Sequence, residues 1–256
     1  MGPRRIVMSR NMLLAIVATL CVSGCSTLKP ASRPALLPEL LAVHADVPVK
    51  IDGRLDDAIW AQARGYALGL CQDRVAQGHE FMEGGWVRFA WDEQYLYMAV
   101  ELKDSDVVAE GTADGEHHYA KGDVIELFLW PEAHTWYWEL YVTPQDKQSA
   151  FFYPGAGRVL PSAFTHCISL SVAAQVQGTF NDWADHDQGW TGEMAVPVRA
   201  LTRRGESWGL DASWRVLVGR YNYSAYLQAV ELTAMPQLSK TIFHLREEYG
   251  RLRLIR

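Results

Sequence analysis

Two glutamates, Glu126 and Glu139, stand inside apolar runs that have the composition of β-strands. Val124–Trp130 and Trp136–Thr143 are rich in branched and aromatic residues, which is typical of strands. A carboxylate in such a strand costs free energy unless it is paired with another group or faces a cleft. Two carboxylates on neighbouring strands could accept hydrogen bonds from a ligand, or could share a cation or an arginine.

Alternation along each run predicts which side chains accompany the carboxylates. Glu126 should share a face with Phe128, and Glu139 should share a face with Tyr141, because residues two apart in a strand point the same way. Arg220, in Arg220-Tyr221-Asn222-Tyr223, is a candidate partner for both carboxylates, or a solvated charge at a strand end. A salt bridge from Glu126 to Arg220 or to Arg88 is the alternative to a ligand-binding role for Glu126.

Two aspartates, Asp104 and Asp106, alternate just after the strand-like run Tyr95–Leu102. Hard oxygen ligands at this spacing can hold calcium. The Asp-x-Asp-Gly pattern of a calcium loop is missing, so a solvated turn is favoured over a calcium site. No Cys-x-x-Cys or His-x-x-x-His pair adds further metal-binding spacing.

The chain opens with a pattern typical of export. Arg4, Arg5 and Arg10 precede the apolar run Met12–Val22, which is shorter than the roughly 20 residues that cross a membrane. Ser23-Gly24-Cys25 then resembles a bacterial lipobox, which implies diacylglycerol on Cys25, cleavage before it and a further acyl chain such as palmitate. A plain signal peptide with an incidental cysteine is the alternative.

These features divide the chain into a lipoprotein signal peptide at 1–24, a Pro-containing tether at 25–38 and one domain at 39–256. We expect a protein anchored in the bacterial cell envelope by its lipid. Ser26, which is not Asp, favours the outer membrane by analogy with enterobacterial sorting, on either its periplasmic or its surface face.

The net charge indicates which classes of partner the protein can bind, and the cysteine content indicates whether a disulfide can form. Removing the three leader arginines takes Lys+Arg from 24 to 21 against 30 Asp+Glu, so the net charge falls from -6 to -9. An acidic domain repels phosphates, which argues against nucleic acid as a partner. Outside the leader and the lipid site, Cys71 and Cys167 remain; they could form a disulfide or be two separate buried thiols.

Many short strand-like runs separated by turn residues predict an all-β fold, a sandwich or a barrel, with a few short helical turns. In Tyr95–Leu102 the even positions should form the core face. Several phrases in this order resemble carbohydrate-binding module family 9, which belongs to a wider group of DOMON-like sandwiches. They are Lys50–Trp60, Val87–Asp92 with Tyr95–Tyr97 and Lys103–Asp106, Gly122–Phe128, Gly189–Pro197, and Phe243–His244 with Tyr249–Leu252.

The resemblance implies a jelly-roll-like sandwich of two antiparallel sheets that binds sugar, often the end of a glucan or xylan chain, and holds structural calcium in some members. The family clamps sugar between two aromatic rings, and the matching regions here offer Tyr119 and Phe243. It places a sugar-contacting carboxylate at Glu126, and it can carry a basic residue where this chain has Glu139. Tyr141 and Arg220 complete the predicted ligand-binding set. Phe243 could equally be a core residue.

The predicted function is therefore non-catalytic carbohydrate binding in support of carbohydrate catabolism. Glycoside hydrolysis needs two carboxylates across the scissile bond, and the family's link to hydrolysis comes from separate catalytic domains; the chain also has no Gly-x-Ser-x-Gly or His-Glu-x-x-His motif. Two alternatives stay open. One is a surface-structural lipoprotein that has lost the sugar site. The other is a haem-binding electron-transfer domain, with candidate axial ligands Met98, Met194, His118 and His244.

Overall fold

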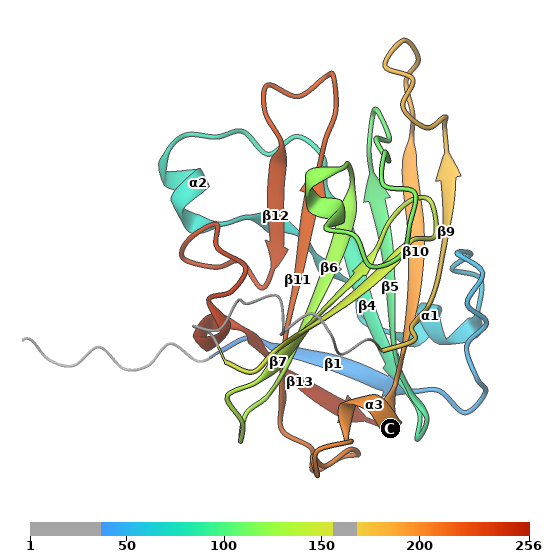
Figure 1. Ribbon diagram of the computed structural model, residues 1–256, viewed down its shortest axis with the longest axis vertical. Coiled ribbons are helices and arrows are strands. Elements are labelled where there is room, and N and C mark those ends of the chain that lie inside the picture. Colours follow the sequence, from blue (N-terminus) through green and yellow to red (C-terminus); the bar gives the residue numbers. More distant parts are fainter. Residues whose placement is uncertain (1–36, 156–167) are drawn as a thin grey trace, which may run out of the picture. The chain divides into compact units, whose positions relative to one another are not determined.

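Strands dominate the part of the chain that the computed structural model describes, residues 37–155 and 168–256 (Figure 1). Leu36–Arg256 forms one compact unit. The leader, Cys25, Cys167 and nearly all of the predicted tether lie outside the described residues. Within the described ranges, no helix has the length and apolar character needed to cross a membrane.

The helical elements are short. They are α1 (Ala58–Gln62), α2 (Gln72–Ala76), α3 (Val198–Leu201) and the 3-10 turns η1 (His118–Ala120) and η3 (Arg246–Glu248). The strands are β1 (Glu39–His44), β2 (Tyr66–Ala67), β3 (Gly69–Leu70), β4 (Gly85–Trp91), β5 (Tyr95–Lys103), β6 (Val124–Pro131), β7 (Tyr137–Val142), β8 (Gln148–Tyr153), β9 (Ser171–Gln177), β10 (Gly189–Pro197), β11 (Trp214–Asn222), β12 (Glu231–Met235) and β13 (Gly250–Ile255).

The described strands form one continuous mixed sheet rather than two separate antiparallel sheets. The main path runs β8-β7-β6-β11-β13-β1-β4-β5-β10-β9, and β12 continues from β11 toward β3. Strand β1 is parallel to both β13 and β4. In Figure 1, β1 in blue and β13 in red run across the foot of the sheet, between its β6–β11 part and its β4–β5 part. The prediction of a mostly-β fold is confirmed, whereas the sheet is mixed, so the described strands do not clearly show the predicted antiparallel sandwich.

The two parts of the sheet pack against each other around the main core. Phe89, Met98 and Met194 come from the β4–β5–β10 part, and Leu127 and Val216 from the β6–β11 part. The even positions of β5 all lie in this core, as alternation predicts. Burying apolar side chains from both parts is what holds the sheet in this arrangement.

Each part also carries an apolar cluster on its outer face. Trp60 of α1 packs over Tyr97 and Ala195 on the β5–β10 part. The buried carboxylate of Glu193 fixes this cover, because it accepts hydrogen bonds from Trp60 Nε1 at 2.8 Å and from the Gly53 amide at 2.9 Å.

The outer face of the β6–β7–β8–β11 part carries the second cluster. Phe128 and Tyr141 of the sheet pack there with Phe243 and Tyr249, which belong to the segment that leads from β12 to β13. This covered face holds the candidate site.

Candidate functional site

A pocket of about 460 Å³ opens on the outer face of the β6–β7–β11 part of the sheet. Its size lies in the range of small-molecule sites. Two carboxylates, a group of aromatic rings and two histidines make up most of its lining. The lining residues are His117, Tyr119, Glu126, Glu139, Tyr153, Tyr221, Leu232, Thr241, Ile242, Phe243 and His244.

Strand register explains why Glu126 has space in front of it. Glu126 pairs with Tyr141 on β7 and with Gly219 on β11, and Gly219 pairs in turn with Ala234 on β12. Directly opposed residues share a face, so two small residues stand beside Glu126. The ring of Phe243 occupies the space above Gly219 and forms one side of the pocket.

The two carboxylates are buried and lie on adjacent strands. Glu126 is 2% exposed and Glu139 is 4% exposed, and Glu126 Oε1 and Glu139 Oε2 are buried oxygens without a hydrogen-bond partner among the described residues. The hydroxyl of Tyr141 donates to Glu139 Oε1. Burial and the nearby charge of Glu139 raise the pKa of Glu126 well above its ordinary value, and a hydrogen bond with Tyr141 offsets part of that rise.

Aromatic rings form the walls. Tyr119, which is 37% exposed, lies 5.5 Å from Tyr221 between ring centroids, and Tyr221 meets Phe243 edge-on at 5.6 Å. Phe243 itself is largely buried, so it is at once a packed residue and a pocket wall. Tyr141 lies behind the carboxylates and is fully buried.

The structure thus brings Tyr119, Glu126, Glu139 and Phe243 of the predicted set to one pocket. It adds seven lining residues from outside the predicted ligand-binding set, among them His117, Tyr153, Tyr221 and His244. His244 Nε2 lies 3.9 Å from Glu139 Oε2, and its Nδ1 lies 2.9 Å from the Tyr137 hydroxyl. His244 directly follows Phe243, and Tyr221 directly follows Arg220. Each of these two lining residues is therefore next in the sequence to a residue of the predicted set.

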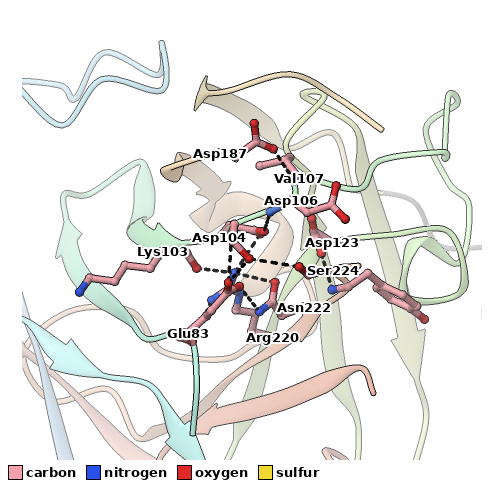
Figure 2. A network of polar contacts seen from close by, with 12 residues as sticks. Glu83, Lys103, Asp104, Asp106, Val107, Asp123, Asp187, Arg220, Asn222 and Ser224 are labelled. Carbon is pink, nitrogen blue, oxygen red and sulfur yellow. Dashed lines mark hydrogen bonds and ion pairs between the residues drawn. The ribbon is translucent and has the colours of Figure 1, made fainter. Parts of the chain in front are cut away.

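Arg220 does not belong to the pocket, which corrects the sequence interpretation. It pairs with Ile125, so its side chain points to the opposite face of the sheet from Glu126. Figure 2 shows its partners: Arg220 Nη2 donates to Asp104 Oδ2 at 3.0 Å, to Asn222 Oδ1 at 2.9 Å and to the Lys103 carbonyl at 2.8 Å. Arg88 is also engaged elsewhere, with Glu101. Neither arginine forms the alternative salt bridge to Glu126.

Asp104 and Asp106 are part of this same buried network, so a solvated turn is the wrong description of them. Each is 2% exposed. Asp106 Oδ2 accepts a hydrogen bond from the Ala225 amide at 2.7 Å, and burial raises the pKa of Asp104 to about 7 despite the attraction of Arg220. Among the described residues no three His, Cys, Asp or Glu side chains converge as a metal site.

The other candidates fall in different places. Cys71 is a buried free thiol, and its predicted partner Cys167 lies outside the described residues. Met98 and Met194 face each other in the main core, whereas His244 lines the pocket on the outer face. The methionines and His244 therefore lie on opposite faces of the sheet and do not form a pair of axial haem ligands.

Comparisons with known proteins agree with this fold. The family model described as carbohydrate family 9 binding domain-like matches residues 51–215. A search of curated protein sequences gave no significant match. Among solved structures, a putative carbohydrate-binding protein from Bacteroides uniformis ATCC 8492 superposes with a TM-score of 0.64 at 12% identity, covering 86% of this chain and 100% of its own.

Two further structures are of a carbohydrate-binding module family 9 protein from Caldicellulosiruptor kristjanssonii. The complex with cellotriose has a TM-score of 0.56 at 12% identity and covers 84% of this chain and 93% of its own. The complex with glucose has a TM-score of 0.56 at 13% identity and covers 85% and 95%. At such identities these structures support the fold alone, but the family model spans more than half of the chain. The chain belongs to the carbohydrate family 9 binding domain-like family.

Proposed function

We propose that this protein captures an oligosaccharide or the end of a polysaccharide chain in the pocket between Tyr119 and Phe243. The observation that carries the proposal is the pair of buried carboxylate oxygens, on Glu126 and Glu139, that line this pocket and have no hydrogen-bond partner in the described part of the chain. Sugar hydroxyls are donors for such acceptors, and the C–H faces of a pyranose ring stack on aromatic rings. Membership of the family supports the same ligand class.

The proposed role is binding without catalysis. Glycosidases place one carboxylate on each side of the scissile bond. Here Glu126 and Glu139 lie on adjacent strands of one sheet face, and both interact with the single hydroxyl of Tyr141. Two carboxylates that share one neighbour in this way approach a ligand from the same side, which favours capture over cleavage.

A glycan array probed with the purified protein tests the proposal. We expect binding to a restricted set of oligosaccharides, because the pocket is small and its acceptors are fixed on strands. The array should also carry amino sugars and their N-acetylated forms. A protein that binds no glycan on the array would contradict the proposed function.

Gly219 provides a test of the aromatic wall. A Cβ atom at Gly219 would lie 2.5 Å from Phe243 Cε2, so Gly219→Ala should push the ring of Phe243 out of place. We expect saccharide affinity to fall about 3- to 10-fold, because an aromatic contact contributes about 0.5–1.5 kcal/mol. Gly155→Ala is the matched control, since no atom of the described residues beyond its chain neighbours lies within 4 Å of its added Cβ. Equal affinities for the Gly219 and Gly155 variants would remove Phe243 from the binding wall.

The lipid anchor is a separate part of the proposal. It is supported by the lipobox-like Ser23-Gly24-Cys25, and it would hold the sugar site at the cell envelope, at the outer membrane by the argument from Ser26. Cys25→Ala should abolish incorporation of a labelled fatty acid and shift the protein from the membrane fraction to the soluble fraction. Cys71→Ala is the control, because its thiol is buried within the domain. Equal labelling of both variants would contradict the anchor.

A further inference from the structure

The charge of the pocket floor bears on whether the bound saccharide is neutral or carries a positive charge. Glu126 and Glu139 both contribute carboxylates, and none of the described residues that line the pocket is Lys or Arg. His244 is the lining residue that comes within ion-pair distance of a carboxylate, with its Nε2 at 3.9 Å from Glu139 Oε2. The described lining therefore carries two carboxylates and no lysine or arginine to balance them.

Two buried carboxylates side by side are costly while both are ionised. The pair must hold a proton or receive a cation. The raised pKa of Glu126 is consistent with the first state in the empty pocket. A ligand with hydroxyl groups alone donates hydrogen bonds but leaves the negative charge in place, whereas a ligand with an ammonium group both donates and neutralises.

The walls favour the same class of ligand. The rings of Tyr119, Tyr221 and Phe243 line the pocket beside the carboxylates, and a cation over an aromatic face is attracted by the ring quadrupole. The other titratable groups around the carboxylates are tyrosines 137, 141, 153 and 249 and histidines 117 and 244. Burial is the largest cause of the raised pKa of Tyr141 and Tyr249, so these two hydroxyls stay neutral and do not add charge.

We propose that the ligand is an amino sugar with a free amine, whose ammonium group lies between the carboxylates of Glu126 and Glu139. This inference rests on the proposed saccharide function. The sugar ring would stack against the aromatic walls. The ammonium group would replace the proton that the two carboxylates hold in the empty pocket. An N-acetylated amino sugar carries no charge at this position and would lose the interaction.

Calorimetric titration of the purified protein at about pH 7 with three trisaccharides tests this inference. The three are a glucosamine trimer, its fully N-acetylated counterpart and cellotriose. We expect the glucosamine trimer to bind at least 10-fold more tightly than the other two. Its binding should also release protons, seen as a dependence of the measured heat on the ionisation enthalpy of the buffer.

Two variants locate the effect. Glu139→Gln removes one of the two charges and should reduce the preference for the amine to less than about 3-fold. Glu101→Gln is the matched control, because it makes the same change on β5, where Glu101 pairs with Arg88 outside this pocket. This variant should keep the full preference.

The outcomes distinguish this inference from the proposed function. Equal affinity for cellotriose and the glucosamine trimer would overturn the amino-sugar assignment and leave saccharide capture standing. A preference that survives in Glu139→Gln would also overturn it, because the charge would then come from elsewhere. Binding of none of the three sugars overturns the assignment, and a negative glycan array would in addition overturn the proposed function.

Discussion

Glu126→Gln should weaken saccharide binding about 10- to 150-fold. A hydrogen bond to a charged group contributes about 1.5–3 kcal/mol, and about 1.4 kcal/mol corresponds to a factor of ten. Glu126 is buried and its Oε1 has no hydrogen-bond partner among the described residues, so a ligand donor would add a hydrogen bond there that the unliganded protein lacks. Glutamine keeps the size of the side chain but cannot ionise, so it cannot carry the charge that a ligand donor would stabilise in the complex. Calorimetry with whichever glycan binds best measures the difference.

The control for this measurement is again Glu101→Gln, which makes the same substitution on an exposed part of β5. Its affinity should match that of the wild type. If Glu126→Gln binds as tightly as this control, Glu126 does not contact the ligand and the assignment of the pocket floor is wrong.

Although Glu126→Gln should weaken saccharide binding, it should increase the stability of the folded protein at neutral pH. The pKa of Glu126 is raised in the folded state, so above about pH 4.3 the unfolded chain loses this proton while the folded protein retains it. The folded protein then binds more protons, and stability falls as pH rises through this window. Glutamine does not titrate, so Glu126→Gln does not lose stability in this way as the pH rises. We expect the variant to be more stable than the wild type at pH 7 and equally stable below about pH 4, as measured by urea unfolding.

Arg220→Met should lower the free energy of unfolding by about 3–5 kcal/mol, the cost of leaving one member of a buried ion pair without its partner. Arg220 is fully buried. Its guanidinium donates to Asp104 and to two carbonyl groups, those of Glu83 and Lys103. Methionine fills part of the volume but donates nothing, so the charge of Asp104 and both carbonyls would be buried without this donor. Urea unfolding at pH 7 measures the loss.

A double variant separates charge from packing. Arg220→Met combined with Asp104→Asn removes the unpaired carboxylate, so it should be more stable than Arg220→Met alone. A loss below about 1 kcal/mol for Arg220→Met, or no recovery in the double variant, would contradict the description of Arg220 and Asp104 as a buried ion pair.

Strand alternation made the pocket floor predictable. Glu126 and Glu139 sit in long runs whose period of two is unambiguous, and their outward neighbours Phe128 and Tyr141 lie in the outer cluster as expected. Alternation alone did not reveal the face of Arg220, because that depends on register with β6. Arg220 pairs with Ile125 rather than with Glu126, and a difference of one residue moves a side chain to the other face.

Features that depend on contacts between distant segments were harder to predict from the sequence. Strand β1 (Glu39–His44) is not among the strand-like runs that the sequence predicts. It forms by pairing in parallel with β13, at the other end of the domain, and with β4. Asp104 and Asp106 looked like a turn, since local sequence does not show that Arg220 lies against them. His117 and Tyr153 enter the pocket from separate segments in the same way.

A crystal structure of the protein with its best-binding oligosaccharide would locate the bound sugar. We expect a pyranose ring between Tyr119 and Phe243, with ligand donors within hydrogen-bond distance of Glu126 Oε1 and Glu139 Oε2. A sugar bound at another groove, with this pocket empty at saturating ligand, would contradict it.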